Sequence, residues 1–406
     1  MSGNENGRGR IPWAWWLLLV SVLVSPALWA ATRGPSAGLA ALPPLPEGIG
    51  DELDERLDGG FFRLVDAAGR EITQTARILA EGDSYIDEDN RLYRVTAVVG
   101  DLVRVEEAGL VQLPDPAEIR AQFDRQPSVL ASVAQFLGLA QKPNRVVGIY
   151  HTHSDESYVP TSGTETEWTG DIYQVGRVMR DALEEAGYTV YWSDNNHNPH
   201  DGQAYLRSRR TAAELLRHRP GTLIDVHRDA IPDPNAYLTR QNGDSVARVR
   251  LVVGRQNQNQ EANLEYAKRL KALADDEFPG LVKGIFLARG NYNQDLGPNT
   301  ILLEFGTHTV SLADAQKAAQ LFAKVIPAAA GLAPGTGGSA EAGQGAAGWR
   351  WVAWLLVAAV LGTIAFLVLN KGAWERWSRR LGGAGGGSME ASEELSPPAE
   401  EREGRG

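Results

Sequence analysis

The chain has 406 residues, carries a formal net charge of −11 and contains no cysteine. An acidic protein repels a phosphate backbone, so the composition argues against nonspecific binding of nucleic acid. The lack of cysteine excludes disulfides, thiolate nucleophiles and cysteine-bound zinc, so a metal site would have to use His, Asp or Glu.

Two apolar segments without charged residues lie near the two ends of the chain. Residues 11–31 follow Arg8 and Arg10, and they are long enough to form a membrane-spanning helix. Residues 351–369 have the same character and are followed by Lys371 and other basic residues. Because basic residues favour the cytoplasmic side, we expect both termini in the cytoplasm and the region between the spans outside the cell membrane. The alternatives are a cleaved signal for the first segment and a buried core helix for the second.

Between these segments the residue pattern predicts two folded regions. Residues 51–112 contain short alternating apolar runs separated by Gly, Asp and Asn, which predict a small β module. A helical pattern covers 115–142, and residues 143–330 then alternate β-branched runs with amphipathic segments. This alternation predicts an α/β domain with a mainly parallel sheet flanked by helices. A Gly/Ala linker at 331–348 leads to the second span, and the composition of residues 382–406 predicts a disordered tail.

The apolar periods also predict the elements of these two regions. In the β module we expect strands at 61–65, 85–87, 91–95 and 102–105. In the α/β domain we expect strands at 145–150, 188–192, 223–226, 248–253, 284–288 and 300–305, and helices at 171–187, 205–218, 257–278 and 311–330.

Titratable side chains follow or end three of these strands. They are His151, His153, Asp155 and Glu156 after the first strand, Asp225, His227, Arg228 and Asp229 at the third, and Glu304 and His308 at the last. Parallel strands present their carboxyl ends at one edge of a sheet, so these groups can converge. Three His or carboxylate ligands with a fourth position left for water make a hydrolytic zinc site.

Each of these residues alone also has an ordinary structural explanation. A His at a strand end can cap a loop, and Glu304 could pair with Arg228 or Arg289. The predicted α/β domain at 143–330 has no Gly-x-Ser-x-Gly elbow and no Walker loop, which argues against a serine hydrolase and a nucleotide hydrolase. The combination of several such strand ends therefore favours a metal-dependent hydrolase.

Four short segments of this domain resemble the stage II sporulation protein P family. They are His151-Thr152-His153 with Glu156-Ser157-Tyr158, His200-Asp201 with Tyr205 and Ser208-Arg209, Asp225-Val226-His227-Arg228-Asp229, and Leu303-Glu304-Phe305-Gly306. The resemblance implies an amidase-like fold and a zinc-dependent N-acetylmuramoyl-L-alanine amidase with an added peptidoglycan endopeptidase activity. It further implies hydrolysis of septal cell wall during sporulation and engulfment, with a glycan-cleaving enzyme similar to stage II sporulation protein D as partner.

Within the resemblance, each site residue takes a role. His153, Glu156 and His227 would hold Zn²⁺, and Glu304 would be the general base. Arg228 would hold the peptide carboxylate or the oxyanion. The expected function is therefore that of a membrane-anchored peptidoglycan hydrolase. Two alternatives stay open: an enzyme whose main activity is cleavage of peptide cross-links, and a non-catalytic scaffold that binds the wall.

Two features depart from the expected pattern. The wider amidase fold takes its carboxylate ligand from the helix after the first strand, but residues 171–176 contain no glutamate. Asp155, His151 and His308 therefore stay open as alternatives to Glu156. The second membrane span is also unexpected for this family.

Overall fold

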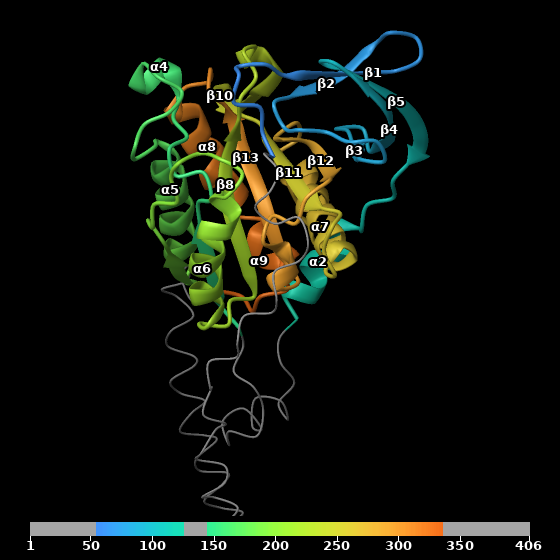
Figure 1. Ribbon diagram of the computed structural model, residues 1–406. Coiled ribbons are helices and arrows are strands. Elements are labelled where there is room, and N and C mark those ends of the chain that lie inside the picture. Colours follow the sequence, from blue (N-terminus) through green and yellow to red (C-terminus); the bar gives the residue numbers. More distant parts are fainter. Residues whose placement is uncertain (1–53, 126–143, 336–406) are drawn as a thin grey trace, which may run out of the picture. The chain divides into compact units, whose positions relative to one another are not determined.

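The structure is a computed structural model that describes residues 54–125 and 144–335. A single 11-stranded sheet with helices on both faces forms its centre (Figure 1). The strands are β1 (Phe62–Val65), β2 (Glu71–Thr75), β3 (Ser84–Ile86), β4 (Arg91–Val99), β5 (Leu102–Leu110), β6 (Val146–Tyr150), β7 (Thr189–Trp192), β8 (Thr222–Asp229), β11 (Val249–Gly254), β12 (Val282–Ala288) and β13 (Thr300–Thr307), and β9 (Leu238–Gln241) pairs separately with β10 (Asp244–Ala247). The helices are α2 (Pro116–Phe123), α4 (Val159–Ser162), α5 (Ile172–Glu185), α6 (Ala204–Leu216), α7 (Gln260–Glu277), α8 (Leu312–Ala323) and α9 (Ile326–Ala329), with short 3-10 turns η1 (Pro234–Tyr237) and η2 (Gln294–Leu296).

Several predicted segments lie outside the described residues. These are the two expected membrane spans at 11–31 and 351–369, the tail at 382–406, most of the linker at 331–348, and the second half of the helical pattern at 115–142. Among the residues that the structure describes, no helix is long and apolar enough to cross a membrane.

Four neighbouring strands form the parallel part of the sheet. β7, β6, β8 and β13 lie side by side in this order, and each pair is parallel. The helices α5 and α6 make the two crossovers from β6 to β7 and from β7 to β8, as parallel pairing requires. The carboxyl ends of β6, β8 and β13 consequently meet at one edge of the sheet, which confirms the predicted convergence of these strand ends.

The expectation of a mainly parallel sheet is wrong for the whole molecule, because the sheet is mixed. β11 runs antiparallel to β13, and β12 runs parallel to β11 through the crossover helix α7. No crossover helix lies between β8 and β11 or between β12 and β13; the connections hold only a hairpin and short 3-10 turns. A chain that returns without a crossover must run antiparallel. Periodicity predicts the strands but carries no signal for their direction.

The N-terminal strands β1–β5 continue the same sheet. β3 pairs antiparallel with β12, with Ile86 opposite Ile285, so the expected β module and the α/β domain share one ladder. The module also curls back over one face of the α/β domain, because its core residues Leu64 and Val103 belong to the same cluster as Phe286 and Leu302. This packing brings the N-terminal residues to the edge where β8 and β13 end.

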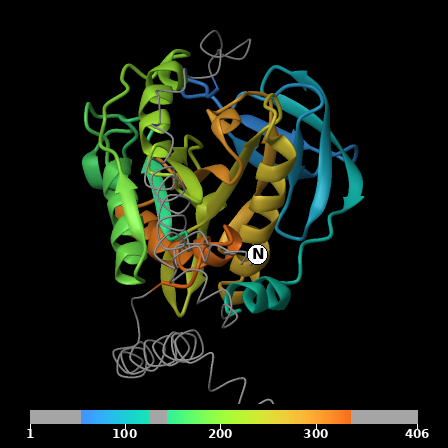
Figure 2. The same cartoon turned by 90° about the horizontal axis from the view of Figure 1, so that it is seen from below.

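The helices divide between the two faces of the sheet. α5, α7 and α8 contribute Met179, Leu270 and Phe322 to one large core, whereas α6 contributes Leu215 to a smaller core on the opposite side. Figure 2 shows the short α2 beside α7 at the end of the molecule seen from below. Both faces of the parallel strands are thus covered, which explains why β8 and β13 are buried along their whole length.

The predicted elements of the α/β domain are all present, with small shifts at their ends. The predicted helix 311–330 is two helices, because Pro327 cannot donate the backbone hydrogen bond that continuation of α8 would need. The hairpin β9–β10 was not predicted, although Asn242-Gly243 at its turn is a strong hairpin signal.

Candidate metal site

The first histidine after β6, His151, has a structural role. Its Nδ1 lies 3.2 Å from the carbonyl oxygen of Val226, and Trp192 Nε1 donates to its Nε2 at 3.1 Å. Gly176 makes room for the ring, since a Cβ there would lie 2.4 Å from it. Burial lowers the pKa of His151 to about 4, so the ring is neutral and both of its nitrogens are engaged. His151 therefore does not offer a nitrogen to a metal.

Glu156 reaches the site on a loop that folds back on itself. Glu156 forms a β-bridge with Thr166, and Gly170 N donates to the carbonyl oxygen of Ser154 at 2.9 Å. Only glycine fits at position 170, because a Cβ there would lie 2.3 Å from the carbonyl oxygen of Glu156. The carboxylate is fully buried at the carboxyl ends of β6 and β8.

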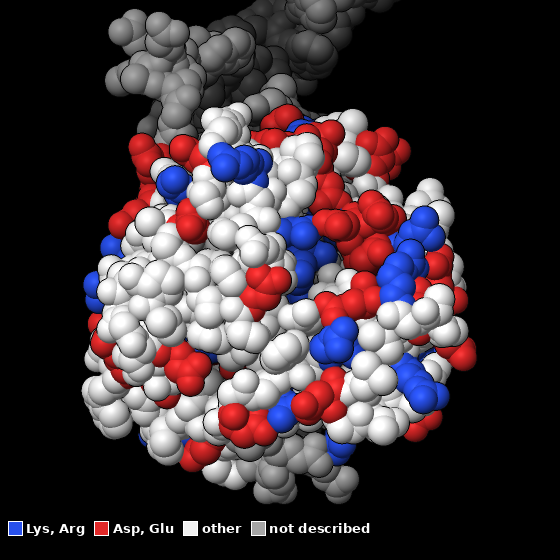
Figure 3. Space-filling view, turned by 90° about the horizontal axis from the view of Figure 1, so that it is seen from above, with Lys and Arg blue, Asp and Glu red and all other residues white. Residues whose placement is uncertain are grey.

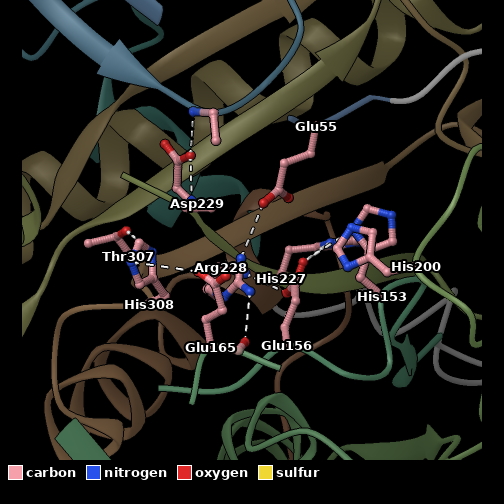
Figure 4. Close-up of polar contacts among 12 residues, drawn as sticks. Glu55, His153, Glu156, Glu165, His200, His227, Arg228, Asp229, Thr307 and His308 are labelled. Atoms are coloured by element: carbon pink, nitrogen blue, oxygen red, sulfur yellow. Dashed lines mark hydrogen bonds and ion pairs between the residues drawn. The ribbon is translucent and has the colours of Figure 1, made fainter. Parts of the chain in front are cut away.

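The three predicted ligands lie together. Glu156 Oε1 is 3.2 Å from Nδ1 of His153 and 3.2 Å from Nδ1 of His227 (Figure 4). Glu156 Oε2 accepts a hydrogen bond of 2.8 Å from the backbone N–H of Arg228, which fixes the carboxylate between the two strand ends. Exposure of the three side chains is 1% or less. The structure thus brings together residues from two strand ends that are far apart in sequence.

Two further residues join this group. One oxygen of Glu55, one of Glu156 and one ring nitrogen each of His153 and His200 all lie within 4.8 Å of one another. His200 stacks on His153 with ring centroids 3.7 Å apart, and its Nδ1 lies 3.1 Å from Asp155 Oδ1. We refer to His153, Glu156, His200 and His227 as the histidine cluster.

The other candidate ligands are engaged elsewhere. Asp155 orients His200, and a carboxylate that holds one ring nitrogen leaves the other free to bind a metal. His308 lies at the end of β13, with its Nε2 3.9 Å from Glu165. Among the described residues, Glu156 is the carboxylate that contacts both His153 and His227, which favours it as the carboxylate ligand. His227 lies outside the group formed by Glu55, His153, Glu156 and His200, so its place among the ligands rests on its contact with Glu156.

The carboxylates around the histidine cluster favour positive charge on its imidazole rings. Burial opposes charging of His227, but the carboxylates of Asp225 and Glu156 raise its pKa to about 9. Burial likewise opposes charging of His153, and Asp54 and Glu156 raise its pKa well above the usual range. In a protein without metal these imidazoles hold protons, and a divalent cation could replace them.

The donor atoms fit zinc. The Nε2 atoms of His153, His200 and His227 are buried and have no hydrogen-bond partner among the described residues. Oxygens of Asp54 and Asp225 lie 3.4 and 3.0 Å from two of these nitrogens, but not in a direction that makes a hydrogen bond. Buried nitrogens without partners beside carboxylates are what a His and carboxylate zinc site requires.

Arg228 lines the cluster on the side of the N-terminal segment. Its guanidinium donates to Glu55 Oε1 at 3.2 Å and to the carbonyl oxygen of Glu165 at 2.9 Å (Figure 4). Arg228 is 2% exposed, and burial opposes its charge while Glu156 and Glu55 raise its pKa. A buried guanidinium next to metal ligands can bind a carboxylate or an oxyanion.

Glu304 lies on β13 beside His227, its register partner on β8, but its carboxylate is held by other residues. Oε1 accepts from Arg77 Nη2 at 2.7 Å, and Oε2 lies 3.1 Å from the hydroxyl oxygen of Tyr237. Tyr237 and Arg250 also bind Asp229, each at 2.7 Å. We refer to Arg77, Asp229, Tyr237, Arg250 and Glu304 as the arginine network. Its partner for Glu304 is Arg77, not the Arg228 or Arg289 considered from sequence.

The sequence pattern gave no ligand role to two residues beside the predicted ligands, His200 and Glu55, for different reasons. His200 follows β7, another parallel strand whose carboxyl end lies at the same edge, so the strand-end argument could have found it. Glu55 follows a segment rich in Pro and Gly and reaches the site only through the packing of the β1–β5 region. Periodicity carries no signal for such a contact.

Seen from the edge where β8 and β13 end, the surface carries both signs of charge, with acidic side chains gathered at one side of a group of basic ones (Figure 3). The described part of this face shows no broad basic area.

Comparisons with known proteins place the chain in a family. Residues 107–327 match the family model of stage II sporulation protein P. The curated stage II sporulation protein P of Bacillus subtilis (strain 168) is 34% identical over 202 residues, which cover 45% of this chain and 50% of that protein. The chain thus matches about half the length of this relative.

Three solved structures are similar at low identity. The CwlD amidase of Clostridioides difficile, solved in complex with the GerS lipoprotein, is 13% identical, with a TM-score of 0.33 and coverage of 46% of this chain and 96% of that one. An N-acetylmuramoyl-L-alanine amidase of Clostridium difficile 630 is 16% identical, with a TM-score of 0.30 and coverage of 47% and 95%. Amidase AmiC2 of Nostoc punctiforme is 14% identical, with a TM-score of 0.29 and coverage of 47% and 96%. The family match, which spans more than half of the chain and includes every predicted site residue, shows that the chain belongs to the stage II sporulation protein P family.

Proposed function

We propose that this protein is a zinc-dependent peptidoglycan hydrolase that cleaves the amide bond between N-acetylmuramic acid and L-alanine in sporulation septa. Membership of the stage II sporulation protein P family supports a cell-wall hydrolase of sporulation. The single observation that carries the metal assignment is the position of Glu156 Oε1, 3.2 Å from both His153 and His227.

In this proposal His153, Glu156 and His227 hold the zinc. Bound zinc would lower the pKa of a water molecule to about 7 and polarise the amide carbonyl. Glu304 Oε2 would accept the proton of the attacking water and return it to the leaving amine. Arg228 would bind a carboxylate of the stem peptide, in the way it binds the carboxylate of Glu55 in the structure.

Digestion of purified sacculi tests the reaction itself. Mass spectrometry of the products should show free stem peptides and glycan strands that keep intact sugar ends. Release of uncrosslinked muropeptides alone would instead establish the endopeptidase alternative. A protein that binds sacculi without releasing any product would be the scaffold.

Two histidine variants test the ligand set. His227→Ala should lose zinc, measured by metal analysis after dialysis, because it removes a nitrogen next to Glu156. His200→Ala is the matched comparison, and it should retain the metal with weakened affinity because Glu156 and the other two histidines remain. If His200→Ala loses zinc and His227→Ala keeps it, the third ligand is His200. Glu304→Gln should retain zinc and lose about 100-fold or more in rate.

We also propose that the two apolar segments at 11–31 and 351–369 anchor the protein in the cell membrane, with both termini in the cytoplasm and the hydrolase outside. A glycan-cleaving enzyme similar to stage II sporulation protein D would act with it on the same wall. A reporter enzyme fused after Gly382 should be active in the cytoplasm, and labelling of that fusion from outside the cell would disprove this topology.

A further inference from the structure

The residues that begin the described chain lie across the histidine cluster. Residues 54–58, which we call the strap, are tied down by backbone hydrogen bonds to the segment that follows β2. Ile78 N donates to the carbonyl oxygen of Asp54 at 2.8 Å, and Arg56 N donates to that of Ala76 at 2.9 Å. Glu55 and Arg77 form an antiparallel β-bridge between these two bonds. The strap is thus held in place as a short strand would be.

The strap delivers a carboxylate into the cluster. Glu55 is 7% exposed, and one of its oxygens lies within 4.8 Å of donor atoms on His153, Glu156 and His200 (Figure 4). Arg228, which is buried, donates to Glu55 Oε1 at 3.2 Å and so fixes the carboxylate beside the cluster. Burying a carboxylate is costly, so the position of Glu55 inside the site is not that of an ordinary surface glutamate.

The two histidine rings that Glu55 approaches each keep one nitrogen without a hydrogen bond. Nε2 of His153 and Nε2 of His200 are buried without a hydrogen-bond partner among residues 54–125 and 144–335. The four donors around this space include two of the three proposed ligands, His153 and Glu156, together with Glu55 and His200. His227 is not one of these four donors and joins them through its contact with Glu156. Zinc in a closed site takes four donors. Hydrolysis needs one of the four positions for water.

The segment that pairs with the strap contacts Glu304, the proposed general base. Arg77, the bridge partner of Glu55, donates to Glu304 Oε1 at 2.7 Å, and its other nitrogen Nη1 lies 3.3 Å from Asp54. Arg77 and Glu304 are 3% and 2% exposed. The strap therefore places Glu55 beside the metal ligands, and the segment paired with the strap places Arg77 against the proposed base, Glu304.

A polymer such as peptidoglycan cannot reach groups that are buried to this degree. His153, Glu156, His227 and Glu304 are between 0 and 2% exposed in the described chain. Asp54 and Glu55 of the strap lie beside His153, and Arg77, which pairs with the strap, binds Glu304, so a bound substrate and the strap exclude each other.

We propose that Glu55 is an intramolecular metal ligand that closes the active site at rest, and that the strap must leave before peptidoglycan can bind. This inference rests on the proposed function, because it concerns the same metal. Glu55 takes the coordination position that the reaction needs, and Arg228 holds Glu55 where it would otherwise hold a carboxylate of the substrate. A ligand tethered to its own site acts at an effective concentration of the order of millimolar, so it closes the site without being permanent.

Cobalt and zinc binding to the purified full chain test this inference. The variants are Glu55→Ala and the isosteric Glu55→Gln, with Glu81→Ala as the control, because Glu81 is an exposed glutamate of the same region. We expect the two Glu55 variants to bind zinc about 10-fold more weakly than the control. Their cobalt forms should show changed visible absorption and should bind azide, which the wild-type and control cobalt forms should not.

Activity gives a second readout. Glu55→Gln should release stem peptides from sacculi at least about 5-fold faster than wild type at saturating zinc, since an amide is a weaker ligand than a carboxylate. Zinc affinity, cobalt spectrum and azide binding equal to those of Glu81→Ala would overturn the inference and leave the proposed function intact. A wild-type chain that binds neither zinc nor cobalt would overturn both. Melting curves of the metal-free variants identify any variant that is unfolded, and a folded Glu55→Gln suffices for the test.

Discussion

Two groups of buried charges lie side by side in this protein, and they differ in how their atoms are satisfied. In the arginine network the carboxylates of Asp229 and Glu304 are paired with the guanidinium groups of Arg250 and Arg77, of which the two Nε atoms lack a hydrogen-bond partner in the described chain. In the histidine cluster three ring nitrogens have no such partner among the described residues. Buried carboxylates paired with guanidinium groups define a structure, whereas buried imidazole nitrogens without a partner, which can give up a proton and bind a metal, indicate a missing ligand. Burial alone would not distinguish the two groups.

The largest expected effect is on the free energy of unfolding, which should depend strongly on the arginine network. Arg250→Met leaves Asp229 without its buried cation, so the free energy of unfolding should fall by about 3–5 kcal/mol in urea denaturation. Arg94→Met, at an exposed position of β4, should cost less than about 0.5 kcal/mol. Zinc bound per folded molecule should be the same in both variants. A loss of less than about 1 kcal/mol in Arg250→Met would contradict the structural role of the network.

The next effect concerns proton release from the histidine cluster. The pKa of His227 is raised to about 9 and that of His153 well above its usual range, so in the metal-free protein both rings are protonated at pH 7.5. Zinc binding should release about two protons, measured by calorimetry in buffers of different ionisation enthalpy. If His227→Ala still binds zinc, binding should release about one proton fewer than in the wild-type protein. Zinc binding without proton release would contradict the charges assigned to the cluster.

The cluster should also give the metal-free protein a distinct pH dependence. The folded pKa of His227 lies above the usual value of 6.5, so its contribution to stability is complete below about pH 6.5 and is lost as the pH rises through about 9. Saturation with zinc should remove this decline, because the metal replaces the protons. Chemical denaturation between pH 6 and 9, with and without zinc, measures the difference.

The last effect has the opposite sign and belongs to the side of the arginine network. Burial and the cations Arg250 and Arg248 lower the pKa of Lys283 to about 7, while its unfolded value is 10.5. Between these values the unfolded chain binds the extra proton, so stability should rise with pH by up to about 1.4 kcal/mol per unit. In Lys283→Met this rise should disappear. An unchanged slope in that variant would show that Lys283 keeps its proton when folded.

The sequence predicted the parts of the site that depend on local order. Apolar β-branched runs that end in titratable side chains placed His153, Glu156 and His227 among the candidates, and the family resemblance selected them as ligands. Parallel pairing of β6 and β8 explains why they meet. The contacts of Glu304 with Arg77 and of Arg228 with Glu55 join residues more than 170 positions apart. No period or motif encodes such pairs, because they depend on how the β1–β5 region packs over the sheet. The directions of β11 and β12 were missed for a related reason, since they depend on the type of connection.

The pairing of β3 with β12 has a consequence for how the protein folds. The hydroxyl of Tyr85 on β3 bonds the carbonyl oxygen of Lys283 on β12, 198 residues later in the chain. Contacts of such long range slow folding, and the edge of β3 has no partner until nearly the whole domain has been synthesised. A chain truncated before residue 282 should therefore aggregate instead of forming the N-terminal strands alone. Because the strap belongs to these strands, assembly of the sheet and closure over the histidine cluster are expected to occur together, so that newly folded protein starts in the covered state.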